Sequence, residues 1–254
     1  MRAFVAFTKK EFTESVRSYR LFVLAVVFLL LGIMSPLVAK LMPDLISGTD
    51  LGGVTITLPE PTAMDSWAQF FGNVGQMGML ALVITFSGIM ATELSRGTLV
   101  NLLTKGMKRH TVILSKFLTA SLIWTVSYLL CMAVCFAYTE YYWPAATLHE
   151  PFLAFFAPWL FGMLMIVLLI LGGILFGNLY GSLLTCLTTV IALSLINIAS
   201  VAHKYNPISL ASGTLNLLNG HMKAADFIPA AIICAVAVVI LLVTAIAAFN
   251  KKQV

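Results

Sequence analysis

The stretch that decides the fold is residues 151–202, PFLAFFAPWLFGMLMIVLLILGGILFGNLYGSLLTCLTTVIALSLINIASVA, which contains no Asp, Glu, Lys, Arg or His. A bilayer core of about 30 Å is crossed by about 20 apolar residues in an α-helix. The stretch is too long for one such helix, and its length suits two helices joined by a tight turn. We place that turn at residues 177–181, GNLYG, because glycine and asparagine tolerate turn backbone.

The composition of the whole chain agrees with a membrane protein. Of its 254 residues 60% are hydrophobic and only 10% are charged, against about 25% charged in soluble domains. These values exclude a soluble domain, which needs a charged surface, and a disordered chain, which needs low hydrophobicity. Further long apolar runs complete a set of six spans, at about 21–41, 67–92, 115–139, 152–176, 180–202 and 227–249. The sequence predicts an all-α integral membrane protein with six transmembrane helices in a single transmembrane domain, 1–254.

The basic residues indicate the orientation of the six spans. Most of the 15 Lys and Arg residues fall on one side: five before the first span, five in the loop after the second span, and two in the tail. The positive-inside rule places that side, with both termini, in the cytoplasm of a multi-pass cell-membrane protein. The basic excess is explained by topology and by contact with anionic membrane lipids, so we infer no nucleic acid partner. These residues are Arg2, Lys9, Lys10, Arg17, Arg20; Arg96, Lys105, Lys108, Arg109, Lys116; Lys251 and Lys252.

Residues 1–20 have the pattern of an amphipathic helix. Phe4, Phe7 and Phe12 recur at helix-like spacing, with charged residues between them. This pattern favours an interfacial helix on the inner membrane surface. The alternative is a charged leader that only precedes the first span.

The cytoplasmic loop 93–116 contains a second amphipathic segment, predicted as a short helix over 94–106. Thr98 is a suitable N-cap, three leucines form an apolar side, and Gly106 is a natural stop. Such a helix between two spans has the form of a docking element, and it is equally suited to lying on lipid.

Two further regions are not plain spans. The outer segment 205–226 is too polar to cross the membrane and too apolar to float freely, so we expect a short interfacial or re-entrant helix there. In the second span, Gln69, Asn73 and Gln76 share one helix face. Polar residues at that depth usually face protein or water. They indicate either interhelical hydrogen bonds or a substrate path.

The sequence shows no catalytic centre of its own. No span carries a charged residue or histidine in its central part, which argues against an ion-coupled transporter. Metalloprotease and phosphate-binding motifs are absent, the cysteines lie in apolar runs, and no metal site is predicted. Ser87-Gly88 weakly resembles an intramembrane serine nucleophile, but no buried histidine is available as its base. Active transport by this chain would need energy from a partner.

The order of these elements resembles the permease subunits of type-2 ABC exporters over nearly the whole chain. The most specific part is residues 92–103, TELSRGTLVNLL, followed by Lys108-Arg109 and Ser115-Lys116. In that family an acidic residue ends the second span, and a G-T-L-x-x-L-L run forms the coupling helix. The N-terminal segment is similar to the family's interfacial connecting helix, and its matching residues are Lys9, Lys10, Glu11, Phe12 and Arg17. One departure is Gly106-Met107, where family members often have a proline.

The resemblance implies partners and roles. A separate ABC ATPase subunit, in two copies, would bind ATP and Mg, with no cofactor in this chain. A second permease, identical or homologous, would complete the transporter. The ATPase-coupling residues implied are Glu93, Arg96, Gly97, Thr98, Leu99, Leu102 and Leu103.

The leading hypothesis is an ATP-driven exporter that moves a hydrophobic or amphipathic substrate, such as a peptide, lipid or drug, out of the cytoplasm or the inner leaflet. An alternative is a non-transporting membrane sensor or immunity protein that binds an extracellular peptide. A third hypothesis, an intramembrane hydrolase, would depend on Ser87.

Overall fold

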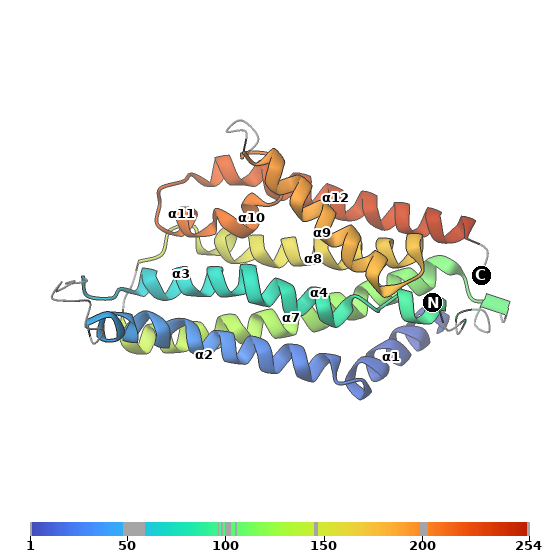
Figure 1. Cartoon of the computed structure of the whole chain (residues 1–254), viewed down its shortest axis with the longest axis horizontal. Coiled ribbons are helices and arrows are strands. Elements are labelled where there is room, and N and C mark those ends of the chain that lie inside the picture. Colours follow the sequence, from blue (N-terminus) through green and yellow to red (C-terminus); the bar gives the residue numbers. More distant parts are fainter. Residues whose placement is uncertain are drawn as a thin grey trace.

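The computed structural model describes residues 2–47, 59–95, 97, 99, 103–104, 106–144, 147–198 and 203–252. All regular elements in these ranges are helical, and Figure 1 shows their arrangement. They are α1 (Arg2–Arg17), α2 (Arg20–Ser47), α3 (Ala63–Asn73), the π-helical turn η1 (Val74–Gly78), α4 (Met79–Phe86), α5 (Ala91–Ser95), α7 (Arg109–Tyr142), α8 (Pro151–Phe176), α9 (Leu179–Ile196), α10 (Ser209–Ser212), α11 (Thr214–Leu218) and α12 (Ala224–Lys251).

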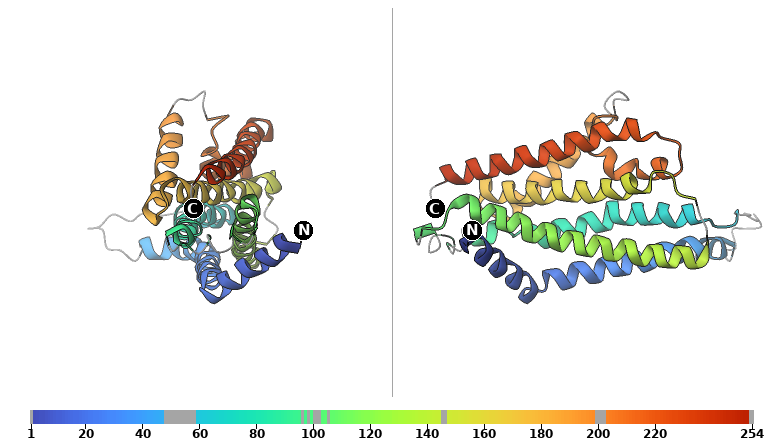
Figure 2. Two further views of the ribbon diagram at one scale, coloured as in Figure 1. Left: turned by 90° about the vertical axis from the view of Figure 1, so that its right-hand side faces the viewer. Right: turned by 180° about the vertical axis from the view of Figure 1, so that it is seen from behind.

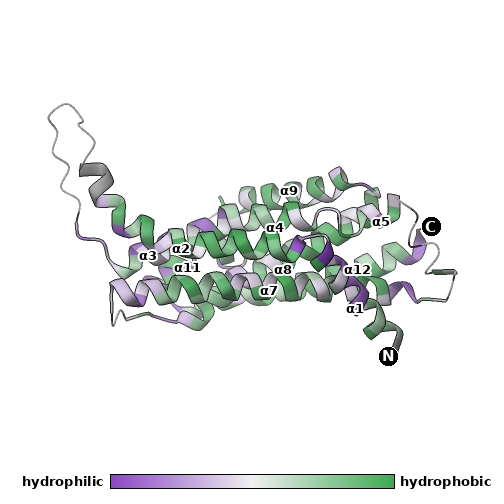
Figure 3. Cartoon of the chain, turned by 90° about the horizontal axis from the view of Figure 1, so that it is seen from below, coloured by the Kyte–Doolittle hydropathy of each residue, from purple (hydrophilic) through white to green (hydrophobic). Residues whose placement is uncertain are grey.

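Six helical stretches are long and apolar enough to cross a membrane, which confirms the six predicted spans. One of the six combines α3, η1, α4 and α5; the other five are α2, α7, α8, α9 and α12. Hydrophobic residues dominate the length of these helices in Figure 3. Helix α1 and the end of α12 lie at the same end of the bundle (Figures 1 and 2).

Helix α8 is the centre of the bundle. It packs against α7, α9 and α12, and also against the shorter helices α4, α5, α10 and α11. Of its most apolar 18-residue window, 83% is buried, whereas the corresponding shares are 17% for α9 and 22% for α12. This strongly hydrophobic helix therefore faces protein, whereas α9 and α12 leave broad faces open.

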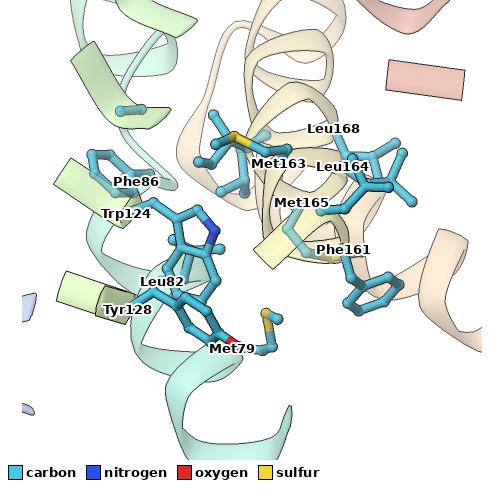
Figure 4. Close-up of a cluster of buried hydrophobic side chains, with 14 of the residues drawn as sticks. Met79, Leu82, Phe86, Trp124, Tyr128, Phe161, Met163, Leu164, Met165 and Leu168 are labelled. Carbon is cyan, nitrogen blue, oxygen red and sulfur yellow. The ribbon is translucent and has the colours of Figure 1, made fainter. Parts of the chain in front are cut away.

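Buried aromatic side chains join α7 to α8 (Figure 4). Two of them are anchored on α8 by hydrogen bonds: Trp124 Nε1 donates to the Trp159 carbonyl at 3.0 Å and the Tyr128 hydroxyl to the Phe155 carbonyl at 2.7 Å. Gly162 makes room for the indole, since a Cβ at that position would lie 2.4 Å from Trp124 Cε2. The polar atoms of these large residues are thus satisfied inside an apolar core.

The turn between α8 and α9 is the one that the sequence indicates. Helix α8 ends at Phe176, and Gly177 follows with φ +70°, a conformation that glycine adopts freely. Asn178 then caps α9, because its Oδ1 accepts a hydrogen bond from the Gly181 backbone N–H at 2.7 Å.

Three differences between the structure and the expected spans affect the interpretation. The second span is interrupted by the π-helical turn Val74–Gly78, which period-3.6 analysis does not detect. Helix α7 begins at Arg109, before the expected residue 115, so Lys116 lies inside a helix and is buried instead of belonging to a loop. Helix α9 ends at Ile196, and residues 199–202 of the expected span lie outside the described residues.

The outer segment 205–226 contains two short helices instead of one. Both α10 and α11 pack against α8 and α3, and their apolar residues Leu210, Leu217 and Leu218 are buried. Asn206 Nδ2 donates to the Leu193 carbonyl at 2.7 Å, which fastens the start of the segment to α9. The segment therefore folds back onto the bundle.

Candidate functional site

A group of charged side chains lies where α1, α5 and α7 meet, and we call it the charge cluster: Lys10, Glu11, Glu14, Glu93 and Lys116. Lys10, Glu11 and Glu14 belong to α1, Glu93 to α5 and Lys116 to α7. Only 2% of the Lys116 side chain is exposed, 5% of Glu11 and 11% of Glu93. Charged residues are almost never buried to this degree unless they are paired.

Lys116 is the centre of the cluster. Its Nζ lies 2.8 Å from Glu11 Oε2 and 2.8 Å from Glu93 Oε2. One ammonium group thereby bridges two carboxylates that come from two different elements. Thr8 Oγ1 also donates to Ser115 Oγ at 3.0 Å, so α1 and α7 are joined next to the ion pairs.

Lys10 forms the more exposed edge of the cluster. Its Nζ lies 2.6 Å from Glu14, 2.9 Å from Glu11 and 3.0 Å from Glu93. Partial burial alone lowers the pKa of Lys10, but hydrogen bonds to Glu14 and Glu11 and the charge of Glu93 outweigh it, so the pKa is raised above its ordinary value. For Glu14 the effects have opposite signs: burial raises its pKa, and the hydrogen bond to Lys10 lowers it. The net pKa of Glu14 is below the ordinary value.

The charge cluster is better suited to connecting helices than to binding a metal ion. Glu11, Glu14 and Glu93 hold carboxylate oxygens within 4.8 Å of one another, a spacing that also suits a metal ion. The ammonium groups of Lys10 and Lys116 already pair with these carboxylates, however, and supply the positive charge that a metal would bring. Within the described residues the cluster therefore connects three helices and does not assemble a metal centre.

The predicted ATPase-coupling residues occupy different environments. Glu93 is held in the charge cluster, and Gly97 turns the chain after α5 with φ +65°, so a helix cannot run unbroken from residue 94. Leu99 is fully buried and Leu103 packs partly against the core, so contact with an ATPase would require Leu99 to turn outward. Gly106 has φ +84°, as a helix stop requires. Arg96, Thr98 and Leu102 lie outside the described residues, and the coupling helix and its contacts remain predictions.

The predicted interfacial residues divide between two faces of α1. Lys9, Phe12 and Arg17 are exposed. Glu11 is buried and enters the charge cluster, and Lys10, although also exposed, reaches the cluster through its Nζ. Helix α1 is thus fastened to the bundle through charge, while its exposed face remains available to a membrane surface.

The three polar residues of the second span also separate. Asn73 Nδ2 donates to Ser35 Oγ on α2 at 3.1 Å, an interhelical hydrogen bond. Gln69 is half-buried. Gln76 is exposed and lines two cavities. Of the three, Gln76 is the residue whose position suits a substrate path.

The larger of these two cavities is an apolar groove between α4, α8 and α9. Its volume is about 820 Å³, and Gln76, Met79, Phe161, Tyr180 and Leu187 are among its lining residues. The second cavity, of about 380 Å³, is more polar and lies between α3 and the short helices α10 and α11. Gly75 and Gln76 of the π-helical turn border both cavities, which places the turn between an apolar and a more polar compartment.

Sequence reasoning did not identify Lys116 as the centre of a site. The charge pattern favours a basic loop for Lys116, and no local pattern links it to Glu11, which lies 105 residues earlier. One signal was present: Lys116 stands among apolar and small residues, where a lysine needs a partner. Ser87, the residue of the hydrolase hypothesis, donates its hydroxyl to the Ile84 carbonyl at 2.9 Å, and all four histidines are exposed.

The comparisons with known proteins bear on the whole chain. A family model described as "ABC-2 family transporter protein" matches residues 5–254. The uncharacterized transmembrane protein YxlG of Bacillus subtilis (strain 168) is 24% identical over 130 residues, a region that covers 50% of this chain and 50% of that protein. The family match extends over all six spans and over the elements that carry the charge cluster. The chain belongs to the ABC-2 transporter family, and it is a membrane permease subunit of a type-2 ABC transporter.

Proposed function

We propose that this permease is half of an ATP-driven exporter whose ATPase is a separate subunit docked at the loop between α5 and α7. The observation that carries the proposal is the charge cluster. It joins α1, α5 and α7 at the point where the loop leaves α5. Displacement of that loop would therefore move three helices together.

The burial of the cluster explains why force would pass through it. In water an exposed ion pair contributes about 0–1 kcal/mol and separates easily. Breaking a buried pair costs about 3–5 kcal/mol, because it leaves an uncompensated charge out of water. The two ion pairs of Lys116 have such buried partners, so they hold while a load is applied.

The cytoplasm is the proposed location of the docking end. Twelve of the 15 basic residues belong to the N-terminal segment, the 93–116 loop and the C-terminal tail, and the positive-inside rule favours the cytoplasm for such a set. Helices α1, α5 and the end of α12 share that end of the bundle (Figure 3), which supports one cytoplasmic docking face. ATP and Mg would be bound by the ATPase subunits.

The groove between α4, α8 and α9 supports a hydrophobic or amphipathic cargo. Its walls carry methionine, leucine, valine and phenylalanine, and Gln76 stands at its border with the more polar cavity. A long apolar molecule with a small polar group fits such a pair of compartments. The exposed faces of α9 and α12 would be covered by lipid or by a second permease, with two ATPases completing the transporter.

The test is reconstitution of the full chain with the ATPase that co-purifies with it, followed by measurement of ATP hydrolysis and of transport across vesicles. We expect Glu93→Gln, which preserves side-chain size and removes the charge, to reduce the transport obtained per ATP. The matched control is Glu140→Gln, the same change in α7 near the opposite end of the helix. Equal coupling in both variants would contradict the proposal. Function of the wild type without any ATPase would favour the sensor hypothesis.

A further inference from the structure

Two cations fasten the end of α12 to two other spans at the end of the bundle where the loop enters α7. Arg109, the first residue of α7, donates through NH1 to the carbonyls of Phe249, Asn250 and Lys252 at the end of α12. Lys252 in turn donates through Nζ to the carbonyls of Ile174 and Leu175 at the end of α8. We call this pair of caps the cation clasp.

The clasp uses the electrostatics of helix ends. The last carbonyls of a helix have no partner within the helix and carry partial negative charge, so a cation is favoured there. The guanidinium of Arg109 is planar and permanently charged, and the two hydrogens of its Nη1 are shared among three carbonyls. It also lies 5.3 Å from the ring centroid of the fully buried Phe249, which adds a cation–π contact.

The clasp leads from the loop to the apolar groove. Arg109 stands where the loop before α7 ends. Lys252 holds the last turn of α8, and a Cβ at the adjoining Gly177 would lie 3.4 Å from its Nζ. Beyond that glycine, Asn178 and Tyr180 line one end of the groove.

We propose that Arg109 and Lys252 are positioning residues that transmit displacement of the loop to the α8–α9 turn and so change the width of the groove. This inference rests on the proposed function, in which an ATPase displaces the loop. The charge cluster connects the other end of the loop to α1 and α7, whereas the contacts to α12 and α8 belong to the clasp. Neither cation needs to touch the cargo.

The experiment uses the full chain assembled with its ATPase in lipid nanodiscs, with a fluorophore on Tyr180→Cys. All four native cysteines are buried, and Tyr180 is 81% exposed, so labelling is specific. With the clasp intact, we expect ATP to change the fluorescence of the label at position 180. Lys252→Gln should reduce that change about fivefold or more. Lys252→Arg, which retains a cationic donor, should restore it. The ATPase rate and the amount of bound ATPase should be the same in all variants.

Two controls separate transmission from general damage. Lys251→Gln makes the same change of charge at the exposed neighbouring position, Lys223→Gln makes it at the exposed N-cap of α12, and both should behave as wild type. Arg109→Gln tests the other half of the clasp, and it keeps the proposal falsifiable if Lys252→Gln fails to fold. A normal ATP response in a folded clasp variant overturns the inference. The inference is also overturned if ATP does not change the fluorescence when the clasp is intact and the ATPase is bound and active. If no ATPase partner binds at all, it is the proposed function that is refuted.

Discussion

Replacing Lys116 by methionine removes the cation at the centre of the charge cluster and preserves most of its apolar stem. The change leaves the carboxylates of Glu11 and Glu93 facing each other without the ammonium that lies 2.8 Å from each of them. Breaking a buried pair in this way costs about 3–5 kcal/mol. Lys10 still pairs with both carboxylates, but its side chain is 44% exposed, so solvent screens it and it offsets only a small part of this cost. For a chain of about this size, each kcal/mol shifts the midpoint of thermal unfolding by about 2–4 °C. We therefore expect a midpoint about 6–20 °C below that of the wild type.

The assay is thermal unfolding of the purified full chain in one detergent, followed by intrinsic tryptophan fluorescence. Lys108→Met is the matched control, because Lys108 is exposed and its loss should change the free energy of unfolding by less than about 0.5 kcal/mol. Adding Glu11→Gln and Glu93→Gln to Lys116→Met removes the stranded charges and should recover most of the loss. A single variant that melts within about 2 °C of the wild type, or a triple variant no better than the single one, refutes the reasoning.

Three further predictions concern packing, hydrogen bonding and pH. Gly162→Ala should destabilise the chain by about 1–3 kcal/mol, because the new Cβ would lie 2.4 Å from a buried indole; Gly72→Ala, with nothing within 4 Å, should stabilise α3 by up to about 1 kcal/mol in the same thermal assay. A double-mutant cycle of Asn73→Ala and Ser35→Ala should give a coupling free energy of about 0.6 kcal/mol. If the two losses of stability are simply additive, the hydrogen bond between these residues does not contribute to stability. The stability difference between wild type and Glu14→Gln should be fully present above pH 4.5 and vanish as the pH falls through the lowered folded-state pKa, whereas a difference that persists in acid would show that Glu14 acts by packing.

The spans were predictable from the sequence because a bilayer imposes one strong rule. Every helix that crosses a bilayer must be long and apolar. The charge-free stretch 151–202 meets this requirement, so it is easily recognised. The turn at Gly177-Asn178 was readable for a second local reason, since few other residues suit that backbone. The apolar composition of each span and the residues of the turn were thus sufficient to predict the six helices and the position of the turn between α8 and α9.

The charge cluster was not predictable, because its members meet only in the folded chain. Glu11 and Lys116 belong to segments that the sequence separates into an interfacial helix and a loop. Their charges also satisfy the positive-inside rule and the amphipathic pattern, so each residue already had a sufficient local explanation. The π-helical turn at Val74–Gly78 was not predicted either, because its residues fit the pattern of an ordinary apolar span.

The central position of α8 has a consequence for how the protein is made. With no charged residue or histidine over its 26 residues, this helix is stable in lipid by itself, before any neighbour has packed against it. Lipid tails are as apolar as leucine, so the helices made before and after it must displace lipid without help from hydrophobicity. The shapes of the helix surfaces therefore decide which helices pack together. The glycines at 162, 172 and 173 contribute to this shape, because a Cβ at each would lie 2.4, 2.5 and 3.0 Å, respectively, from a side chain of another helix. During biogenesis α8 therefore acts as a template, and errors at these three positions should appear as misassembled protein rather than as failed membrane insertion.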